Sequence, residues 1–282
     1  MSQSIISRFA PSPTGRLHLG HAASALRAHD LARAYGGRFL LRIEDIDPGR
    51  SRSDYIDGIY EDLRWLGLDW DGEPVLQSRR LPLYADALDR LRTMDLAYPC
   101  FCTRAQIAGE IAASASAPHG PDGSLYPGTC RHLSDETRVH RIASGEPHAW
   151  RLNMAAAAQR AGSLSWHDET AGRIEATPDI HGDIILARKE TPTSYHLAVT
   201  IDDAAQGVTD VVRGKDLFAA TDVHRLLQAL LDLPTPLYHH HPLLTDEQGK
   251  RLAKRHGAPT LKSMREGGAD PAKLVATLRT GM

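Results

Sequence analysis

The sequence predicts an α/β fold: a doubly wound, Rossmann-type parallel sheet, interrupted by an inserted domain and followed by a short helical region. An apolar run, Ile5 to Phe9, precedes a Pro- and Gly-containing loop and an Ala-rich segment, Ala22 to Tyr35, as in a strand, loop and helix. Strand and helix patterns then fade from about residue 98 and return after Gly182. The residues after Lys254 contain only two short helical patterns.

These changes of pattern divide the chain into four expected parts. Residues 1–97 form the first half of a nucleotide-binding catalytic domain, and residues 98–183 form the insertion. Residues 184–241 complete the catalytic domain. Residues 242–282 supply a nucleotide loop and a short helical tail, with no anticodon-binding domain. A small-residue stretch with Pro and Gly, 112–123, is typical of a linker inside such an insertion.

The loop from Arg8 to His21 is the first candidate for a binding site. Its prolines fix φ, and Gly20 lets another molecule approach the first helical turn. The start of a helix carries unpaired N–H groups and a positive dipole end, which favour a phosphate chain. Because His18 and His21 share one face of that turn, their imidazoles could donate hydrogen bonds to phosphate oxygens.

The run Arg38 to Ile43 predicts a second strand, which delivers Glu44 to the sheet edge where ligands bind in open α/β folds. Asp45 and Asp47 follow it, and the sequence does not decide between a functional role and solvated loop charges for either of them.

The next segments predict packing helices. Ser53 is the expected N-cap of a helix to Leu66, with Ile56, Ile59, Tyr60 and Leu63 on its buried face. A helix from Leu81 to Met94 has an expected buried stripe of Leu83, Ala87, Leu88 and Leu91.

Later in the chain, the patterns predict strands at Asp183–Arg188 and Val208–Gly214, a helix at Leu217–Leu231, and short helices at Leu261–Arg265 and Pro271–Arg279. The three histidines from His239 to His241 alternate in direction on an extended chain, so they are interpreted as packing and loop residues rather than metal ligands.

Several ordered motifs together resemble the class I aminoacyl-tRNA synthetases of the glutamate and glutamine group. The block Arg-Phe-Ala-Pro-Ser-Pro-Thr-Gly from Arg8 precedes His18-Leu19-Gly20-His21, which matches the His-Ile-Gly-His signature. Arg42-Ile43-Glu44-Asp45 and the blocks around Tyr195 and Arg213 follow in the family's order. Arg251-Leu-Ala-Lys254-Arg-His-Gly corresponds to the second signature, with Arg251 in place of Lys and Ala253 in place of Ser.

This resemblance implies roles for individual residues. The implied catalytic residues are His18, His21 and Lys254, and the implied ATP-binding residues are His18, Gly20, His21, Arg251 and Lys254. The implied glutamate-binding residues are Arg8, Phe9, Ala10, Pro11, Ser12, Glu44, Tyr195 and Arg213. Arg213 would form a planar two-bond fork with a carboxylate, which a Lys could not reproduce. Mg²⁺ would accompany ATP.

The insertion contains the three cysteines of the chain, which fit a metal site or reduced thiols better than a disulfide framework. Cys100, Cys102 and Cys130 leave one position of a zinc site open, for which Tyr126, His119 and His132 are candidates. The resemblance favours Tyr126, since Tyr-x₃-Cys matches the family pattern. Such a closed four-ligand zinc would be structural; three reduced cysteines without metal are the alternative.

Composition limits the classes of partner and the cellular compartment that we expect. The chain is 41% hydrophobic and 24% charged with a net charge of −2, which is ordinary for a globular protein and gives no global basic field. Any RNA binding is therefore local. There is no leader pattern and no apolar stretch of about 20 residues, so a cytoplasmic monomer that does not contact membranes is expected.

Because only 28 residues follow Lys254, the chain resembles the truncated members of the family. These activate L-glutamate with ATP and transfer the glutamyl group to queuosine in the anticodon of tRNA(Asp). Three alternatives remain: a minimal glutamyl-tRNA synthetase that charges a tRNA 3′ end, another nucleotidyltransferase that makes an amide, and a non-catalytic tRNA-binding paralogue.

Overall fold

The structure is a computed structural model that describes residues 4–113, 119–121, 123–244 and 259–280. Its first half contains β1 (Ile6–Phe9), α1 (Leu19–Ala34), β2 (Arg38–Ile43), α2 (Ser53–Trp65) and β3 (Val75–Leu76). The three strands pair in parallel in the order β1-β2-β3. The expected succession of strand, loop and helix is therefore confirmed.

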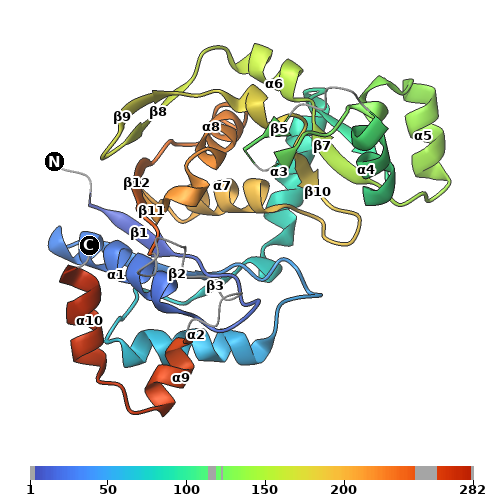
Figure 1. Ribbon diagram of the computed structural model, residues 1–282. Helices are drawn as coiled ribbons and strands as arrows, with labels where there is room; N and C mark the ends of the chain where they lie inside the picture. Colours follow the sequence, from blue (N-terminus) through green and yellow to red (C-terminus); the bar gives the residue numbers. More distant parts are fainter. Residues whose placement is uncertain (1–3, 114–118, 122, 245–258, 281–282) are drawn as a thin grey trace.

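The second half of the sheet comes from much later in the chain. Strands β11 (Asp210–Gly214) and β12 (Leu237–His241) pair in parallel and are connected through α8 (Ala220–Leu230). The N–H of Thr209 donates to the carbonyl of Ile6 (3.0 Å), which joins β11 to β1. Helix α7 (Tyr195–Ala205) precedes β11, and Figure 1 shows these elements beside β1. The interrupted parallel sheet predicted from the sequence is thus present.

The intervening residues form an antiparallel region. Strands β4 (Ala97–Cys100), β7 (Ala149–Leu152) and β10 (Ile185–Ala187) pair in the order β10-β7-β4. A hairpin of β8 (Ser165–Asp168) and β9 (Gly172–Glu175) attaches to the parallel sheet, because β8 pairs in parallel with β12. The remaining elements here are α3 (Leu81–Thr93), α4 (Arg104–Ala113), α5 (Asp135–Ala143), α6 (Met154–Ala161) and the short strands β5 (His119–Gly120) and β6 (Gly123–Ser124).

Four short 3₁₀ helices occupy turns: Gln77–Arg79, Thr129–His132, Pro178–His181 and Lys215–Leu217. At the carboxyl end, α9 (Leu261–Glu266) and α10 (Pro271–Thr280) confirm the two predicted helices. They lie against α2 and α1 (Figure 1). Arg265 of α9 pairs with Asp62 of α2 (2.7 Å), and Arg279 of α10 pairs with Asp30 of α1 (2.7 Å).

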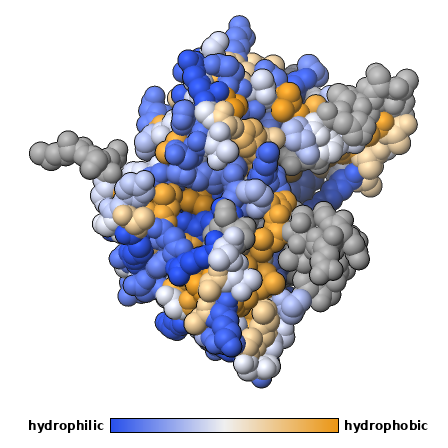
Figure 2. Space-filling model, turned by 60° about the vertical axis from the view of Figure 1, so that its left-hand side comes forward, coloured by the Kyte–Doolittle hydropathy of each residue, from blue (hydrophilic) through white to orange (hydrophobic). Residues whose placement is uncertain are grey.

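Small side chains allow α1 to pack closely on the sheet. Ala25, Ala28 and Ala32 are fully buried and pack with Phe39 and Leu41 of β2 in one hydrophobic cluster. Burial of apolar surface of this kind supplies the main favourable term in folding. No helix in the described part of the chain is long and apolar enough to cross a membrane, and Figure 2 shows a face on which hydrophilic residues surround smaller hydrophobic patches.

Three expectations about local structure were wrong. Arg52, not Ser53, occupies the N-cap of α2, and no side chain caps that end. Leu83 is 41% exposed, and Tyr84 fills the core in its place because its hydroxyl finds a buried acceptor on α7. The three histidines lie on strand β12 rather than in a loop.

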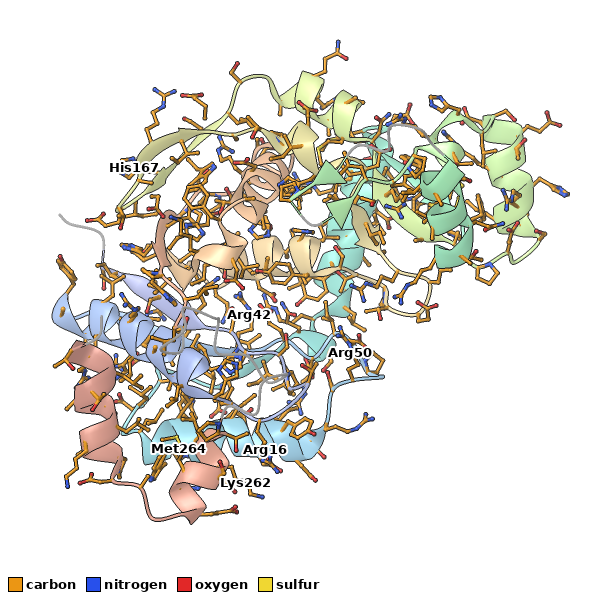
Figure 3. The ribbon with its side chains drawn as sticks, viewed as in Figure 1. Arg16, Arg42, Arg50, His167, Lys262 and Met264 are labelled. Atoms are coloured by element: carbon orange, nitrogen blue, oxygen red, sulfur yellow. The ribbon has the colours of Figure 1, made fainter. Side chains whose placement is uncertain are left out.

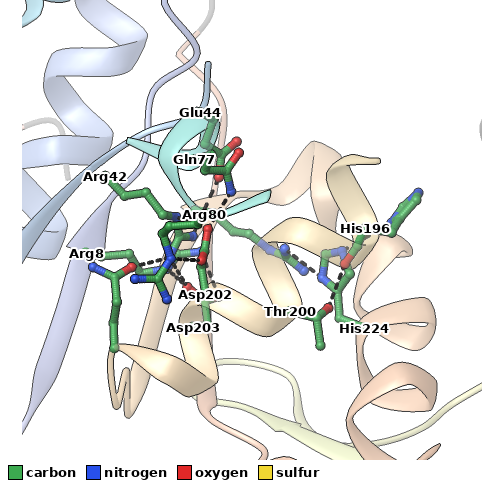
Figure 4. Close-up of polar contacts among 12 residues, drawn as sticks. Arg8, Arg42, Glu44, Gln77, Arg80, His196, Thr200, Asp202, Asp203 and His224 are labelled. Carbon is green, nitrogen blue, oxygen red and sulfur yellow. Dashed lines mark hydrogen bonds and ion pairs between the residues drawn. The ribbon is translucent and has the colours of Figure 1, made fainter. Parts of the chain in front are cut away.

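A buried carboxylate on α7 ties the two halves of the fold together. Asp202 is fully buried and accepts hydrogen bonds from Nε of Arg80 (2.7 Å), Nε2 of Gln77 (2.8 Å) and the hydroxyl of Tyr84 (2.7 Å). Arg42 of β2 lies 3.9 Å away. Figure 4 shows Arg42, Gln77 and Arg80 converging on Asp202 from different segments.

We predict that Asp202→Ala destabilises the protein by about 3–5 kcal/mol, because it leaves buried arginine and tyrosine donors without an acceptor. Urea unfolding followed by circular dichroism measures the loss. Asp89→Ala is the matched control, since Asp89 forms an exposed pair with Arg92 on α3 and such pairs contribute little. Equal stability of the two variants would contradict the prediction.

Candidate active site

A cavity of about 710 Å³ opens at the carboxyl ends of β1, β2 and β11, within the size range of small-molecule sites. Eleven residues that the sequence predicted for the site line this cavity: Arg8, Phe9, Ala10, Pro11, Ser12, His18, Gly20, His21, Glu44, Tyr195 and Arg213. Residues more than 200 positions apart in the chain are thus brought together. Parallel strands account for this, since their carboxyl ends share one sheet edge.

The two signature histidines cap the start of α1. The Gly20 N–H donates to Nδ1 of His18 (3.1 Å), and the His18 N–H donates to Nδ1 of His21 (3.2 Å). An imidazole nitrogen that accepts a hydrogen bond carries no proton, so both rings carry theirs on Nε2. The ring centroids are 3.9 Å apart. The two rings are tilted by 40° to each other, and both Nε2–H donors belong to one helix turn.

The expectation that the first helical turn offers unpaired N–H groups was wrong for two of them. The His18 side chain takes the Gly20 N–H, and the His18 carbonyl takes the His21 N–H (2.9 Å). Gly20 also serves a purpose inside the protein: a Cβ there would lie 3.0 Å from the His18 ring. The imidazole Nδ1 atoms thus take up backbone N–H groups at this turn.

A buried carboxylate holds Arg8. Asp203 of α7 accepts from Nε of Arg8 (3.0 Å) and from a terminal nitrogen of the same guanidinium (3.4 Å), and it also accepts from Arg42 (2.8 Å). Figure 4 shows the three side chains converging. Although burial opposes ionisation, the guanidiniums of Arg8 and Arg42 keep the pKa of Asp203 below its usual value. Asp203 is therefore a fixed anion beneath the cavity.

Glu44 lies in the same charged layer, where it forms an ion pair with Arg42. Its carboxylate is 3.6 Å from Arg42, which is fully buried and projects between the two halves of the fold (Figure 3). Burial raises the pKa of Glu44 to about 7, and the nearby Arg42 and Arg8 only partly offset that rise. Glu44 can thus change charge near neutral pH and would gain from a cationic ligand.

Arg213 is held differently, by neutral groups. Its Nε donates to Nε2 of His240 (3.0 Å), and its terminal nitrogens donate to Nδ1 of His224 (3.2 Å), to the Thr221 hydroxyl (2.6 Å) and to the Leu217 carbonyl (3.2 Å). Sequence reasoning missed all of these partners. His240 was visible only as one of three consecutive histidines, and nothing in the sequence distinguished it from its neighbours.

Other acidic residues near the site have structural partners. Asp45 is buried and accepts from the N–H (2.8 Å) and hydroxyl (2.6 Å) of Ser78, whereas Asp47 pairs with Arg50 (2.7 Å). These contacts assign both aspartates to loop structure. Arg251 and Lys254 lie outside the described residues.

The three cysteines form one cluster. The sulfurs of Cys100, Cys102 and Cys130 all lie within 4.8 Å of one another and form no disulfide. The Tyr126 hydroxyl is 3.4 Å from Sγ of Cys102 and accepts the Cys130 N–H (2.9 Å). Arg151 lies 3.9 Å from the Tyr126 ring centroid. Three thiols and a phenol oxygen thus face one point, which fits the donor set of a tetrahedral soft metal.

His132 is not part of that cluster, and the side chain of His119 lies outside the described residues. Burial raises the pKa of the Cys102 thiol to about 11. Hydrogen bonds from the Tyr126 hydroxyl and the Phe101 N–H lower the pKa of Cys130 despite its burial. Among the three candidates for a fourth ligand, Tyr126 is the one that the described geometry places at the sulfurs.

Residues 4–282 match the family described as tRNA synthetases class I (E and Q), catalytic domain. The chain is 53% identical over 277 residues to the Glutamyl-Q tRNA(Asp) synthetase of Rhodobacter capsulatus, covering 96% of this chain and 98% of the relative. It is 45% identical to the protein of the same name from Symbiobacterium thermophilum, covering 97% and 85%.

Among solved structures, a glutamate tRNA ligase from Elizabethkingia meningosepticum in complex with its amino acid superimposes with a TM-score of 0.83 at 26% identity. The match covers 98% of this chain and 60% of that ligase, so the chain spans less than two thirds of its length. The fold, the motifs and these matches agree. The chain belongs to the class I tRNA synthetases of the glutamate and glutamine group, and it contains their catalytic domain.

Proposed function

We propose that this protein activates L-glutamate with ATP and transfers the glutamyl group to queuosine in the anticodon of tRNA(Asp). One observation carries the proposal. The match to a relative named for this activity is 53% identical and extends over 98% of that relative's length. The glutamate tRNA ligase shares the fold, but this chain corresponds to 60% of it.

The cavity supplies a place for each charged group of glutamate. Glu44 would pair with the amino group, and the arginines would hold the carboxylates. A guanidinium has five N–H donors, of which Arg8 uses three on Asp203 and Val212, leaving one on each terminal nitrogen toward other groups. Arg213 uses four on described residues. Arg8 can therefore donate two hydrogen bonds to a substrate carboxylate. Arg213 can donate one, or two if it releases one of its present partners.

The first step joins an oxygen of the glutamate α-carboxylate to the α-phosphorus of ATP, and the bond to the leaving pyrophosphate breaks. We assign the Nε2–H groups of His18 and His21 to the phosphate oxygens on which charge develops. Lys254 and Arg251 would act on the leaving phosphates. Bound Mg²⁺ would neutralise phosphate charge. In the second step, a queuosine hydroxyl attacks the glutamyl carbonyl, an ester forms and AMP leaves.

We further propose a structural zinc held by Cys100, Cys102, Tyr126 and Cys130. The clustered sulfurs and the adjacent phenol support this assignment. A metal that links β4 to the turn at Thr129–His132 would hold together two segments of the insertion, residues 98–183.

The transfer reaction is the experiment that tests the proposed function. Labelled glutamate should attach to an anticodon stem–loop fragment of tRNA(Asp) that carries queuosine, because the acceptor hydroxyl lies on that base. The same fragment with guanosine in place of queuosine should remain unlabelled. Product that requires an intact 3′ end of tRNA(Glu) would instead identify a minimal glutamyl-tRNA synthetase.

Glutamate binding should depend on pH through Glu44. Below its pKa of about 7 the carboxyl is protonated and cannot pair with the substrate ammonium, and above that pKa it is ionised. We expect affinity for glutamate, measured by calorimetry, to be up to about tenfold weaker at pH 6 than at pH 8. Glu44→Gln should bind weakly with a flat pH profile. Equal wild-type affinity at both pH values would argue against this role.

Metal analysis should find about one zinc per chain in protein purified without chelator. Tyr126→Phe should weaken zinc retention because it removes the fourth donor and keeps the ring. Tyr98→Phe is the matched control, since the Tyr98 hydroxyl donates to Asp183 rather than facing the sulfurs. Protein without zinc would favour three reduced cysteines. Equal zinc retention in both variants would favour a fourth ligand other than Tyr126.

A further inference from the structure

Arg213 is a buried cation whose hydrogen-bond partners among the described residues are all neutral. Its side chain lies beneath the cavity with 5% of the residue exposed. In the described part of the chain no carboxylate forms an ion pair with it, whereas Arg8 and Arg42 both pair with Asp203. A buried charge normally requires such compensation. The orientation of its guanidinium is nevertheless fixed, since four groups accept hydrogen bonds from it.

The tautomer of His240 follows from the chemistry of its neighbours. Arginine only donates hydrogen bonds, so Nε2 of His240 accepts from Arg213 and carries no proton. The proton therefore lies on Nδ1, which donates to the buried carboxylate of Asp168 (2.8 Å). The N–H groups of Thr170 and Ala171 hold Asp168 in turn (3.0 and 2.9 Å). His240 is thus a neutral acceptor fixed from behind.

The tautomer of His224 is the opposite. Its Nδ1 faces Arg213 (3.2 Å) and must accept, so the proton lies on Nε2. That nitrogen is 3.2 Å from Nδ1 of His196 and donates to it. Figure 4 shows His196 and His224 side by side, on α7 and α8. Burial and the charge of Arg213 hold the pKa of His224 well below its usual value, which keeps this ring neutral as well.

We propose that His240 and His224 are positioning residues for Arg213: two neutral imidazoles of opposite tautomer that orient its guanidinium and leave its positive charge to the substrate carboxylate. The inference rests on the proposed role of Arg213 in glutamate binding. It gives a reason for selectivity, because glutamine has the same shape as glutamate but its amide does not compensate a buried cation.

Asparagine and glutamine variants separate the two imidazole nitrogens. An asparagine amide lies near the position of Nδ1, and a glutamine amide reaches that of Nε2. At position 240 only glutamine can present an acceptor to Arg213, so His240→Gln should retain function and His240→Asn should not. At position 224 the order reverses: His224→Asn should retain function and His224→Gln should not.

The readout is the KM for glutamate in glutamate-dependent exchange of pyrophosphate into ATP. We expect it to rise about tenfold or more in His240→Asn and His224→Gln, and to stay within about threefold in the other two variants, with the KM for ATP within about threefold throughout. His167→Gln, at an exposed position of β8 (Figure 3), is the control for a surface histidine. A merely structural role would not reverse the order of Asn and Gln between the positions.

Nitrogen NMR of the wild-type histidines provides a second readout that does not depend on activity. Protonated Nδ1 in His240 and protonated Nε2 in His224 are expected. The opposite tautomers, two doubly protonated rings, or the same ranking of Asn and Gln at both positions would overturn the inference. A wild-type protein with these tautomers but without glutamate-dependent exchange would instead refute the proposed function.

Discussion

The contact on which the site depends is the buried ion cluster of Asp203 with Arg8 and Arg42. It joins β1 and β2 to α7, whose Asp203 lies 195 residues after Arg8 and 161 residues after Arg42. Removing one member of a buried ion pair is strongly destabilising, so the cluster holds these elements together. This cluster holds Arg8 through Asp203, and it contacts Glu44 through Arg42. The same interaction therefore joins the two halves of the fold and positions Arg8 at the cavity.

The two cavity arginines follow different electrostatic rules. Arg8 pairs with Asp203, which it shares with Arg42, and its remaining terminal donors can recognise the shape of a ligand. Arg213 is oriented by neutral acceptors, so no described anion compensates its positive charge. Glu44, raised in pKa by burial, is the complementary acid. A ligand that carries carboxylates and an ammonium group would satisfy both imbalances, which is the physical sense in which this cavity suits an amino acid with an acidic side chain.

Local pattern predicted much of this arrangement. The alternation in Arg38–Ile43 predicted β2, and the proline-containing loop before His18 predicted the end of β1. Because parallel strands share one edge at their carboxyl ends, Glu44 was then predicted to lie at the cavity. The partners of Arg213 and Arg8 could not be predicted, because tertiary contacts over long sequence separations select them. Asp203 and His240 have no periodic signature. For the same reason Tyr84, whose hydroxyl meets Asp202, replaced Leu83 in the core.

We infer that the site is formed before a ligand binds, since protein groups already hold both guanidiniums. Crystal structures with and without a non-hydrolysable glutamyl-adenylate analogue measure this directly. We expect the hydrogen bonds from Nε of Arg8 to Asp203 and from Nε of Arg213 to His240, 3.0 Å each, to persist in both structures. A guanidinium that leaves Asp203 or His240 to reach the ligand would contradict it.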